Sequence, residues 1–202
     1  MKIICIGRNY SEHIRELKNE TPEEPVIFIK PDSAVLRNNS PFFIPAFTQE
    51  VHYEVEVFVK IKKHGKAIPE KFAATYYDEV GLGIDFTARD LQNHSKTKGL
   101  PWEKAKGFDH SAVIGKTFPK SEFQLDNQEF SLKKNGVLVQ QGNTRDMIYS
   151  IDAIIAYVSQ FFTLKKGDLI FTGTPSGVGP VQAGDQLEGF LGNHSAFRFD
   201  IR

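Results

Sequence analysis

The segment VHYEVEVFVKI, residues 51–61, decides the fold class of this chain. Every second position from Val51 to Ile61 is apolar, and most positions between them carry polar or charged side chains. Because successive side chains of a strand point to opposite faces, this alternation predicts one continuous strand with one apolar face. The segment DEVGLGIDF, residues 78–86, alternates in the same way and predicts a second long strand.

Shorter strand-like segments surround this pair and are separated by turn formers. They cover residues 2–6, 26–30, 129–134, 137–141, 169–172, 185–190 and 195–201, and strands also resume at Ser111. The Asn135-Gly136 pair predicts a tight hairpin turn. Residues 31–50 are expected to form an irregular loop.

Helix signals are fewer, and one of them is long. Ser150 is a plausible N-cap before apolar residues at helical spacing over 151–162, and Gly167 ends that segment. Shorter helices are expected from an N-cap at Ser11 to about Lys18, within 70–77, and over 88–95 after a Thr87-x-x-Asp90 capping box. Strands and helices do not alternate regularly, so we expect a strand-dominated α+β fold with a few short helices.

Composition narrows the classes of function. The 202 residues include 25 Lys and Arg and 25 Asp and Glu, so the chain has no global charge that would attract nucleic acid or an anionic membrane. Cys5 is the one cysteine, which excludes an internal disulfide, and the apolar start MKIICIG is too short for a secretory or transmembrane segment. We expect one domain over residues 1–202, located in the cytoplasm.

Glu54 and Glu56 are the strongest chemical signal. In a strand they point to the same face, about 7 Å apart along the backbone. Asp85 lies at the end of the second long strand, on a face that Gly81 and Gly83 leave open to another backbone or a ligand. Three carboxylates without cysteine or paired histidines suit Mg²⁺ or Mn²⁺. The alternative is that the two glutamates belong to a solvated strand face.

Other polar residues fall into two groups. Arg89 and Gln92 follow Asp85 on a predicted helix and share a face, where they could bind a carboxylate, or else they are exposed helix residues. His13 and Glu16, three residues apart on the first helix, are a candidate acid/base pair or part of an ordinary surface helix. Lys106 lies in the aromatic, turn-rich segment PWEKAKGFD, and from the residues alone it is an ordinary surface lysine.

The loop TGTPSGVG, residues 172–179, lacks the Lys-Ser/Thr ending of a phosphate-binding loop, so nucleotide binding is not expected. Its backbone amides and the hydroxyls of Thr172 and Thr174 could bind a ligand carboxylate. Cys5 lies in an apolar strand and is expected to be a packing residue.

Six motifs together resemble the fumarylacetoacetate hydrolase family, in particular its short single-domain branch of acylpyruvate hydrolases and oxaloacetate decarboxylases. In the family's order they are GRNYSEH (7–13), KPDSAV (30–35), HYEVEV (52–57), GIDFTARDLQ (83–92), KGLPWEKAKGFD (98–109) and DLIFTGTPSGVG (168–179). The resemblance implies the family's mixed β-sandwich roll and a homodimer. One departure is HSAVIG at 110–115, where many members have a proline-containing segment.

The resemblance also implies roles for individual residues. Glu54, Glu56 and Asp85 match the ligands of Mg²⁺ or Mn²⁺. His13 and Glu16 match a pair on a mobile N-terminal lid helix, within residues 1–20, that activates water. The remaining matches contact substrate or stabilise negative charge, and they are Arg8, Arg89, Gln92, Lys106 and Thr174, of which Lys106 is expected to be catalytic.

The implied reaction is metal-dependent hydrolysis of a carbon–carbon bond in a small β-diketo acid of the acylpyruvate or fumarylpyruvate type, yielding pyruvate and a carboxylic acid. Two alternatives use the same site: decarboxylation of oxaloacetate and isomerisation of 2-hydroxyhepta-2,4-diene-1,7-dioate. A third alternative is a non-catalytic ligand-binding module. The expected partner of the site is a small 2-oxo acid.

Overall fold

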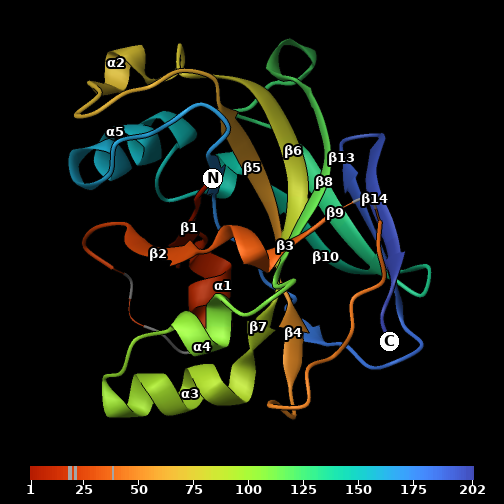
Figure 1. Cartoon of the computed structure of the whole chain (residues 1–202). Coiled ribbons are helices and arrows are strands. Elements are labelled where there is room, and N and C mark those ends of the chain that lie inside the picture. The colour runs from red at the N-terminus through yellow and green to blue at the C-terminus, as the bar shows by residue number, and fades with distance from the viewer. Residues whose placement is uncertain (18–19, 21, 38) are drawn as a thin grey trace.

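The computed structural model describes residues 1–17, 20, 22–37 and 39–202. Strands dominate it, as predicted, and they curl around the molecule while short helices lie at its ends (Figure 1). The largest sheet has seven strands in the order β2-β1-β11-β5-β6-β8-β3. These strands are β1 (Ile3–Gly7), β2 (Val26–Lys30), β3 (Val35–Leu36), β5 (Val55–Ile61), β6 (Tyr77–Asp85), β8 (Ala112–Pro119) and β11 (Leu169–Phe171).

Two smaller sheets complete the strand content of the described residues. The four-stranded sheet is antiparallel and consists of β10 (Val137–Asn143), β9 (Glu129–Lys134), β13 (Gln186–Leu191) and β14 (His194–Asp200), in that order. The three-stranded sheet consists of β12 (Gly179–Pro180), β4 (Val51–Tyr53) and β7 (Thr87–Ala88). The β9–β10 hairpin turns at Asn135 and Gly136, both with positive φ, which confirms the predicted turn.

The α-helices are short. They are α1 (Ser11–Glu16), α2 (Glu70–Ala73), α3 (Arg89–Lys98), α4 (Glu103–Lys106) and α5 (Ile151–Phe161). Three 3₁₀ turns cover 32–34, 120–122 and 144–146. Within the described residues, no helix has the length and apolar character needed to cross a bilayer. Figure 1 shows α1, α3 and α4 near β4 and β7 at one end of the molecule, and α2 and α5 toward the other.

The prediction of one continuous strand over 51–61 is wrong. The chain changes sheets at Glu54, because β4 pairs with β7 and β12 while β5 pairs with β6 and β11. At the junction, the Val55 amide donates to the side chain of Gln140 at 2.9 Å instead of to a neighbouring strand. Alternation of side chains continues through such a break, so the pattern does not reveal it. Both faces of β5 are also buried, apart from Lys60.

The wide sheet packs an apolar core on each face. On one face, Ile154 and Val158 of α5 pack in the same cluster as Ile4 and Val59. On the other, the rings of Phe58 and Phe171 stack with their centroids 5.3 Å apart. Cys5 is fully buried in this second cluster, as expected of a packing residue.

Several local predictions need correction. The Ser150 cap of α5 is confirmed, since its hydroxyl accepts from the Ala153 amide. Ser11 does not cap α1, because the N-cap is Tyr10, whose side chain makes no capping bond; the expected end near Lys18 lies outside the described residues. The predicted capping box at Thr87 and Asp90 is wrong as well. The N-cap of α3 is Ala88, and the Asp90 carboxylate accepts from the Thr48 hydroxyl and the Gln49 amide instead.

Three predicted segments have different bounds. Residues 31–50 are not wholly irregular, because they contain a 3₁₀ turn and β3, which pairs parallel to β8. The helix expected within 70–77 ends at Ala73, and β6 begins at Tyr77. The helix expected over 88–95 continues to Lys98, where Gly99 ends it in the left-handed conformation.

The space beside Gly81 and Gly83 of β6 is occupied by other atoms of the protein, not open to a ligand. A Cβ atom on Gly83 would lie 2.4 Å from the Val113 carbonyl oxygen and 2.7 Å from the Phe171 ring. We predict that Gly83→Ala lowers the free energy of unfolding by about 1–3 kcal/mol because the core is overpacked. The measurement is urea denaturation. Gly7→Ala is the control, since its Cβ would meet neighbours at 3.7–3.8 Å, and equal losses in the two variants would contradict the packing argument.

Candidate metal centre and substrate cavity

Three carboxylates converge where the sheets meet. Glu54 lies at the β4–β5 break, Glu56 lies in β5, and Asp85 ends β6 beside them, its amide donating to the Glu54 carbonyl at 2.8 Å. All three side chains are buried, and one oxygen from each lies within 4.8 Å of the others. The alternative of a solvated strand face is therefore wrong.

Two cations lie against this acidic cluster. Lys106 donates to Glu54 at 2.8 Å, to Asp85 at 2.6 Å and to the Thr87 hydroxyl at 2.6 Å. Arg89 donates to the second oxygen of Glu54 and to the amide oxygen of Gln92. Lys106 is buried, so its interpretation as a surface lysine is wrong, and the same holds for Arg89 and Gln92 as exposed helix residues.

A third cation, Lys30, was not singled out from the sequence. It ends β2 and is completely buried, with its ammonium nitrogen 2.7 Å from Asp85 Oδ1. The angle of this ion pair is outside the range of a regular hydrogen bond, so Oδ1 accepts no aligned donor. The only available signal was a lysine at the end of an apolar strand, a position where a charged residue is normally exposed.

Burial and neighbouring charges shift the pKa values of Glu54 and Glu56 in opposite directions. Burial raises the pKa of Glu56 well above its ordinary value, and the neighbouring carboxylates of Asp85 and Glu54 raise it further. Burial also acts to raise the pKa of Glu54, but Lys106 and Arg89 outweigh it and leave that pKa below its usual range. For Lys106, burial lowers the pKa, and the attraction of Asp85 and Glu54 more than reverses this effect.

His13 and Glu16 connect α1 to the glycine-rich loop. His13 Nδ1 lies 3.2 Å from Glu16 Oε2, and the other oxygen of Glu16 accepts from the Gly177 amide at 3.0 Å. Burial lowers the pKa of His13 despite the nearby carboxylates of Glu54 and Glu16. The imidazole is therefore buried and predominantly neutral at pH 7. The interpretation of His13 as part of a surface helix is wrong.

The loop at 172–179 binds protein carboxylates as well as lining the site. The Gly173 amide donates to Glu56 at 2.8 Å. Thr172 donates its hydroxyl to the Val57 carbonyl, so it is not directed at a ligand as the sequence suggested. Thr174 keeps its place beside the site, where its hydroxyl accepts from Gln140 at 2.9 Å. Gln140 is buried and was not identified from the sequence.

Arg8 is held in an unfavourable conformation. Its φ is 60°, in the left-handed region that a residue with a side chain adopts at a cost of order 1 kcal/mol. Its Nε is buried and has no hydrogen-bond partner. A buried unpaired guanidinium nitrogen is itself unfavourable, so both features point to a group that binds an anion.

These residues surround one cavity of about 30 Å³. Nine of the ten predicted site residues line it, and the tenth, Glu16, contacts one of the nine. Phe28, Trp102 and Lys96 also line it and were not identified from the sequence. Burial and the charges of Arg89 and Arg8 lower the pKa of Lys96 to about 8. At this size the cavity admits about two water molecules, so a larger ligand requires movement of its walls.

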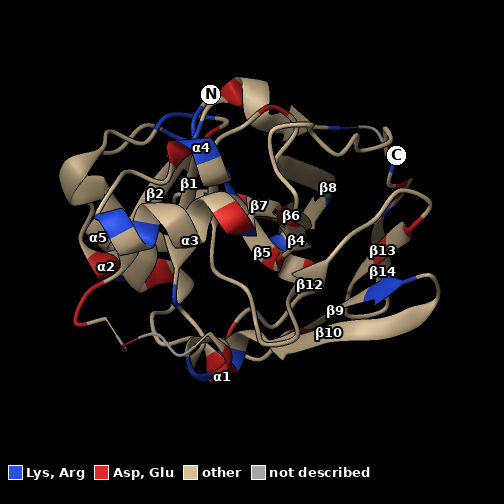
Figure 2. Cartoon of the chain, turned by 90° about the horizontal axis from the view of Figure 1, so that it is seen from below, with Lys and Arg blue, Asp and Glu red and all other residues tan. Residues whose placement is uncertain are grey.

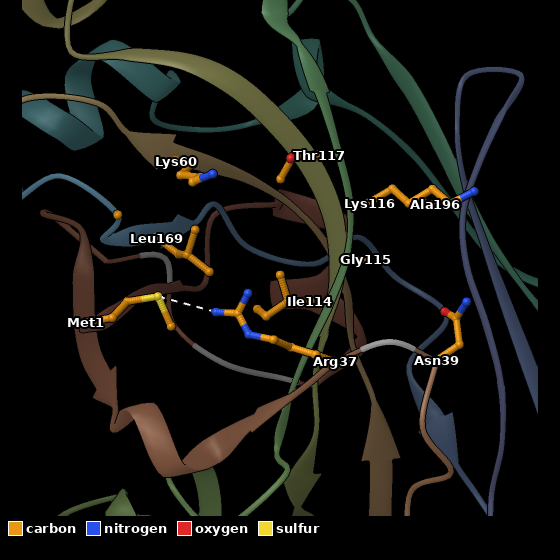
Figure 3. A pocket seen from close by; sticks show the side chains of 11 residues that line it. Met1, Arg37, Asn39, Lys60, Ile114, Gly115, Lys116, Thr117, Leu169 and Ala196 are labelled. Carbon is orange, nitrogen blue, oxygen red and sulfur yellow. Dashed lines mark hydrogen bonds between the residues drawn. The ribbon is translucent and has the colours of Figure 1, made fainter.

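A larger cavity, of about 350 Å³, lies elsewhere and lacks this chemistry. Figure 3 shows its lining, in which Arg37 is directed at the sulfur of Met1. Its Lys60 is already paired with Glu79 at 2.7 Å, and none of the three clustered carboxylates reaches it. The larger of these two cavities is therefore not the one that contains the predicted site residues. Figure 2 views the end that carries α3 and α4, where acidic and basic positions are interspersed along the ribbon.

Known proteins resemble this chain over nearly its whole length. It is 43% identical over 201 residues to the mouse protein named oxaloacetate tautomerase FAHD1, mitochondrial, covering 99% of this chain and 91% of that protein. It is 45% identical over 196 residues to oxaloacetate tautomerase YcgM of Escherichia coli K12, covering 96% and 90%.

A solved structure gives the same result. Fumarylpyruvate hydrolase from Pseudomonas aeruginosa, in complex with Mn²⁺ and pyruvate, matches with a TM-score of 0.94 and 35% identity, covering 100% of this chain and 89% of that one. The model of the fumarylacetoacetate (FAA) hydrolase C-terminal family matches residues 2–200. The chain therefore belongs to the fumarylacetoacetate hydrolase family, as its sequence motifs indicated.

Proposed function

We propose that this protein is a divalent-metal-dependent enzyme that interconverts the keto and enol forms of oxaloacetate. The observation that carries the proposal is the cluster of Glu54, Glu56 and Asp85, buried against Lys106 in a cavity that also contains an unpaired arginine nitrogen. The names of the mouse and Escherichia coli relatives support this choice of substrate. The chemistry is removal of a proton from carbon to form an enolate, followed by protonation of the enolate on oxygen, and the same steps in reverse.

The three carboxylates fit a divalent cation. Their oxygens are close enough to share one ion, and Asp85 Oδ1, although 2.7 Å from the Lys30 ammonium, accepts no aligned hydrogen bond. An all-oxygen set suits Mg²⁺ or Mn²⁺. When bound there, the cation supplies a Lewis acid that favours the negative charge of an enolate.

The charge balance of the cavity favours a substrate with two carboxylates. Five basic side chains line the cavity or contact its lining, against four acidic ones, so the formal sum is 5 − 4 = +1, and a divalent cation would raise it to +3. The basic residues are Arg8, Lys30, Arg89, Lys96 and Lys106. Oxaloacetate is a dianion at neutral pH, as is fumarylpyruvate, whereas a simple acylpyruvate in its keto form carries one charge. We assign a substrate carboxylate to Arg8, because its Nε lacks a partner.

Proton transfer is assigned to His13. Formation of the enol requires a group that removes a proton from the carbon beside the ketone, and protonation of the resulting enolate on oxygen completes it; a buried neutral imidazole can accept the proton and give it up again. Glu16 orients the ring through Nδ1, which leaves Nε2 for the substrate. The positive charge of Lys106, whose three N–H groups already donate to Glu54, Asp85 and Thr87, favours the oxygen that becomes negative. Because the cavity is small, its walls must move to admit the substrate, and α1, which carries His13, is the element we assign to that movement.

Hydrolytic cleavage of an acylpyruvate is the second candidate. The His13–Glu16 pair could equally deprotonate a water molecule, and the structural match to fumarylpyruvate hydrolase supports this alternative. Cleavage needs space for an attacking water beside the substrate, whereas tautomerisation and decarboxylation do not. The two candidates therefore share every residue but differ in their products.

The first prediction concerns His13. With Mn²⁺ or Mg²⁺, the protein is expected to accelerate equilibration of enol and keto oxaloacetate, followed by ultraviolet absorbance of the enol. His13→Ala should lower kcat by about 10²–10⁴-fold while Mn²⁺ binding is retained, because the base is lost but the carboxylates remain. His64→Ala, at an exposed position between β5 and α2, is the matched control and should behave as the unsubstituted protein.

Two results would count against this assignment. Unchanged turnover in His13→Ala would remove the proposed base. Rapid hydrolysis of acetylpyruvate, with no effect on oxaloacetate tautomerisation or decarboxylation, would reject the first candidate in favour of the second. Binding of Mn²⁺ and oxalate without turnover of either substrate would instead support a non-catalytic module.

The second prediction concerns Glu56. Since its pKa is raised, its carboxyl group carries a proton at pH values below that raised pKa, and a divalent cation must displace the proton. Binding of Mn²⁺ should therefore release protons, which calorimetry detects as a heat that varies with the ionisation enthalpy of the buffer. Glu56→Gln should abolish the release and weaken binding. Equal proton release by Glu56→Gln would show that the proton comes from another group.

A further inference from the structure

Lys30 contacts three separate later segments of the chain at the site. Its ammonium group donates to the Ser111 hydroxyl at 2.9 Å and to the carbonyl oxygens of Ser111 at 3.1 Å, Phe86 at 3.2 Å and Lys106. It also forms the ion pair with Asp85. These partners lie at the end of β6, just after it, at the end of α4 and just before β8.

Stability alone does not explain a charge in this position. Lys30 is 0% exposed, and removing an ammonium group from water costs several kcal/mol, which its partners must offset. Apolar residues of similar volume often replace a buried ion pair at no net cost. A buried lysine that contacts both a proposed metal ligand and the backbone of a proposed catalytic residue therefore points to a geometric role.

The backbone of Lys106 needs such support. Helix α4 has four residues, too few to be stable by itself, and its last carbonyl has no partner within the helix. That carbonyl accepts from both Lys30 and the Ser111 hydroxyl. A positive charge at a helix C-terminus is also favourable. Lys30 thus fixes the backbone from which the Lys106 side chain reaches Glu54 and Asp85.

We propose that Lys30 is a positioning residue that holds the Asp85 carboxylate and the Lys106 backbone in register, so that the metal ligand and the lysine that faces the substrate keep their relative placement. The inference rests on the proposed function, because it assigns Lys30 to the same reaction. It does not require Lys30 to contact the substrate, and Lys30 is absent from the residues that line the cavity.

Three variants test this role. Lys30→Met keeps an unbranched side chain that is one heavy atom shorter and removes the ammonium group. Ser111→Ala is milder, since it removes one acceptor of Lys30 and one donor to the Lys106 carbonyl. Lys2→Met is the matched control, because Lys2 forms an ion pair with Asp168 in another part of the sheet. For each protein, calorimetry gives the Kd for Mn²⁺, steady-state kinetics with oxaloacetate give kcat and KM, and thermal unfolding gives Tm.

We expect Lys30→Met to raise the Kd for Mn²⁺ about 10–100-fold, the usual range for removing a group that orients a metal ligand. It should lower kcat at saturating Mn²⁺ at least about 100-fold, with KM within a few-fold. Ser111→Ala should lower kcat about 3–10-fold with Tm nearly unchanged. Lys2→Met should leave Kd and kcat unchanged and lower Tm only.

Two results would overturn the proposal. If Lys30→Met binds Mn²⁺ more tightly, Lys30 merely offsets the charge of the carboxylates. If Kd and kcat are unchanged and only Tm falls, its role is structural. Should Lys30→Met fail to fold, Ser111→Ala decides, and an unchanged kcat in that variant overturns the proposal. Failure of the unsubstituted protein to bind Mn²⁺ or to act on oxaloacetate would reject the proposed function instead.

Discussion

Mutual repulsion of three buried carboxylates is the constraint on which the rest of this structure depends. Glu54, Glu56 and Asp85 bring oxygens within 4.8 Å of one another in a place that water does not reach freely. Such an arrangement is stable only if cations or protons compensate it. The protein meets this requirement with Lys106 between Glu54 and Asp85, with Arg89 on Glu54 and with Lys30 on Asp85, and the remaining repulsion raises the pKa of Glu56 together with burial.

The fold places these charges through changes of direction in the backbone. Because the chain leaves one sheet and enters another at Glu54, the side chain there can face the end of β6 while Glu56 continues along β5. The turn after β6 leads through β7 into α3, which delivers Arg89, and a single helical turn, α4, delivers Lys106. The glycine-rich loop returns from the far end of the chain to bind both Glu56 and Glu16. Reactive groups distant in sequence therefore share one small cavity.

Much of this could be predicted from the sequence. Alternation and turn residues revealed the long strands, and a resemblance of motifs identified the family and nine of the residues that line the cavity. The break at Glu54 could not be predicted, because alternation is the same in one strand or two. Lys30 was missed because burial of a lysine depends on acceptors contributed by three later segments, none of which is visible in the local pattern around residue 30. The capping box failed because Asp90 found tertiary partners that compete with its own helix.

The central claim is that the three carboxylates bind one divalent cation beside the substrate. It is tested most directly by anomalous diffraction at the manganese edge, with crystals of the protein grown with Mn²⁺ and oxalate, a mimic of the pyruvate enolate. The account predicts one manganese peak per chain, coordinated by oxygens of Glu54, Glu56 and Asp85 and by the oxalate. A manganese peak at any other position, with Glu54 and Asp85 still bound only to Lys30, Arg89 and Lys106 and Glu56 only to the Gly173 amide, would contradict it.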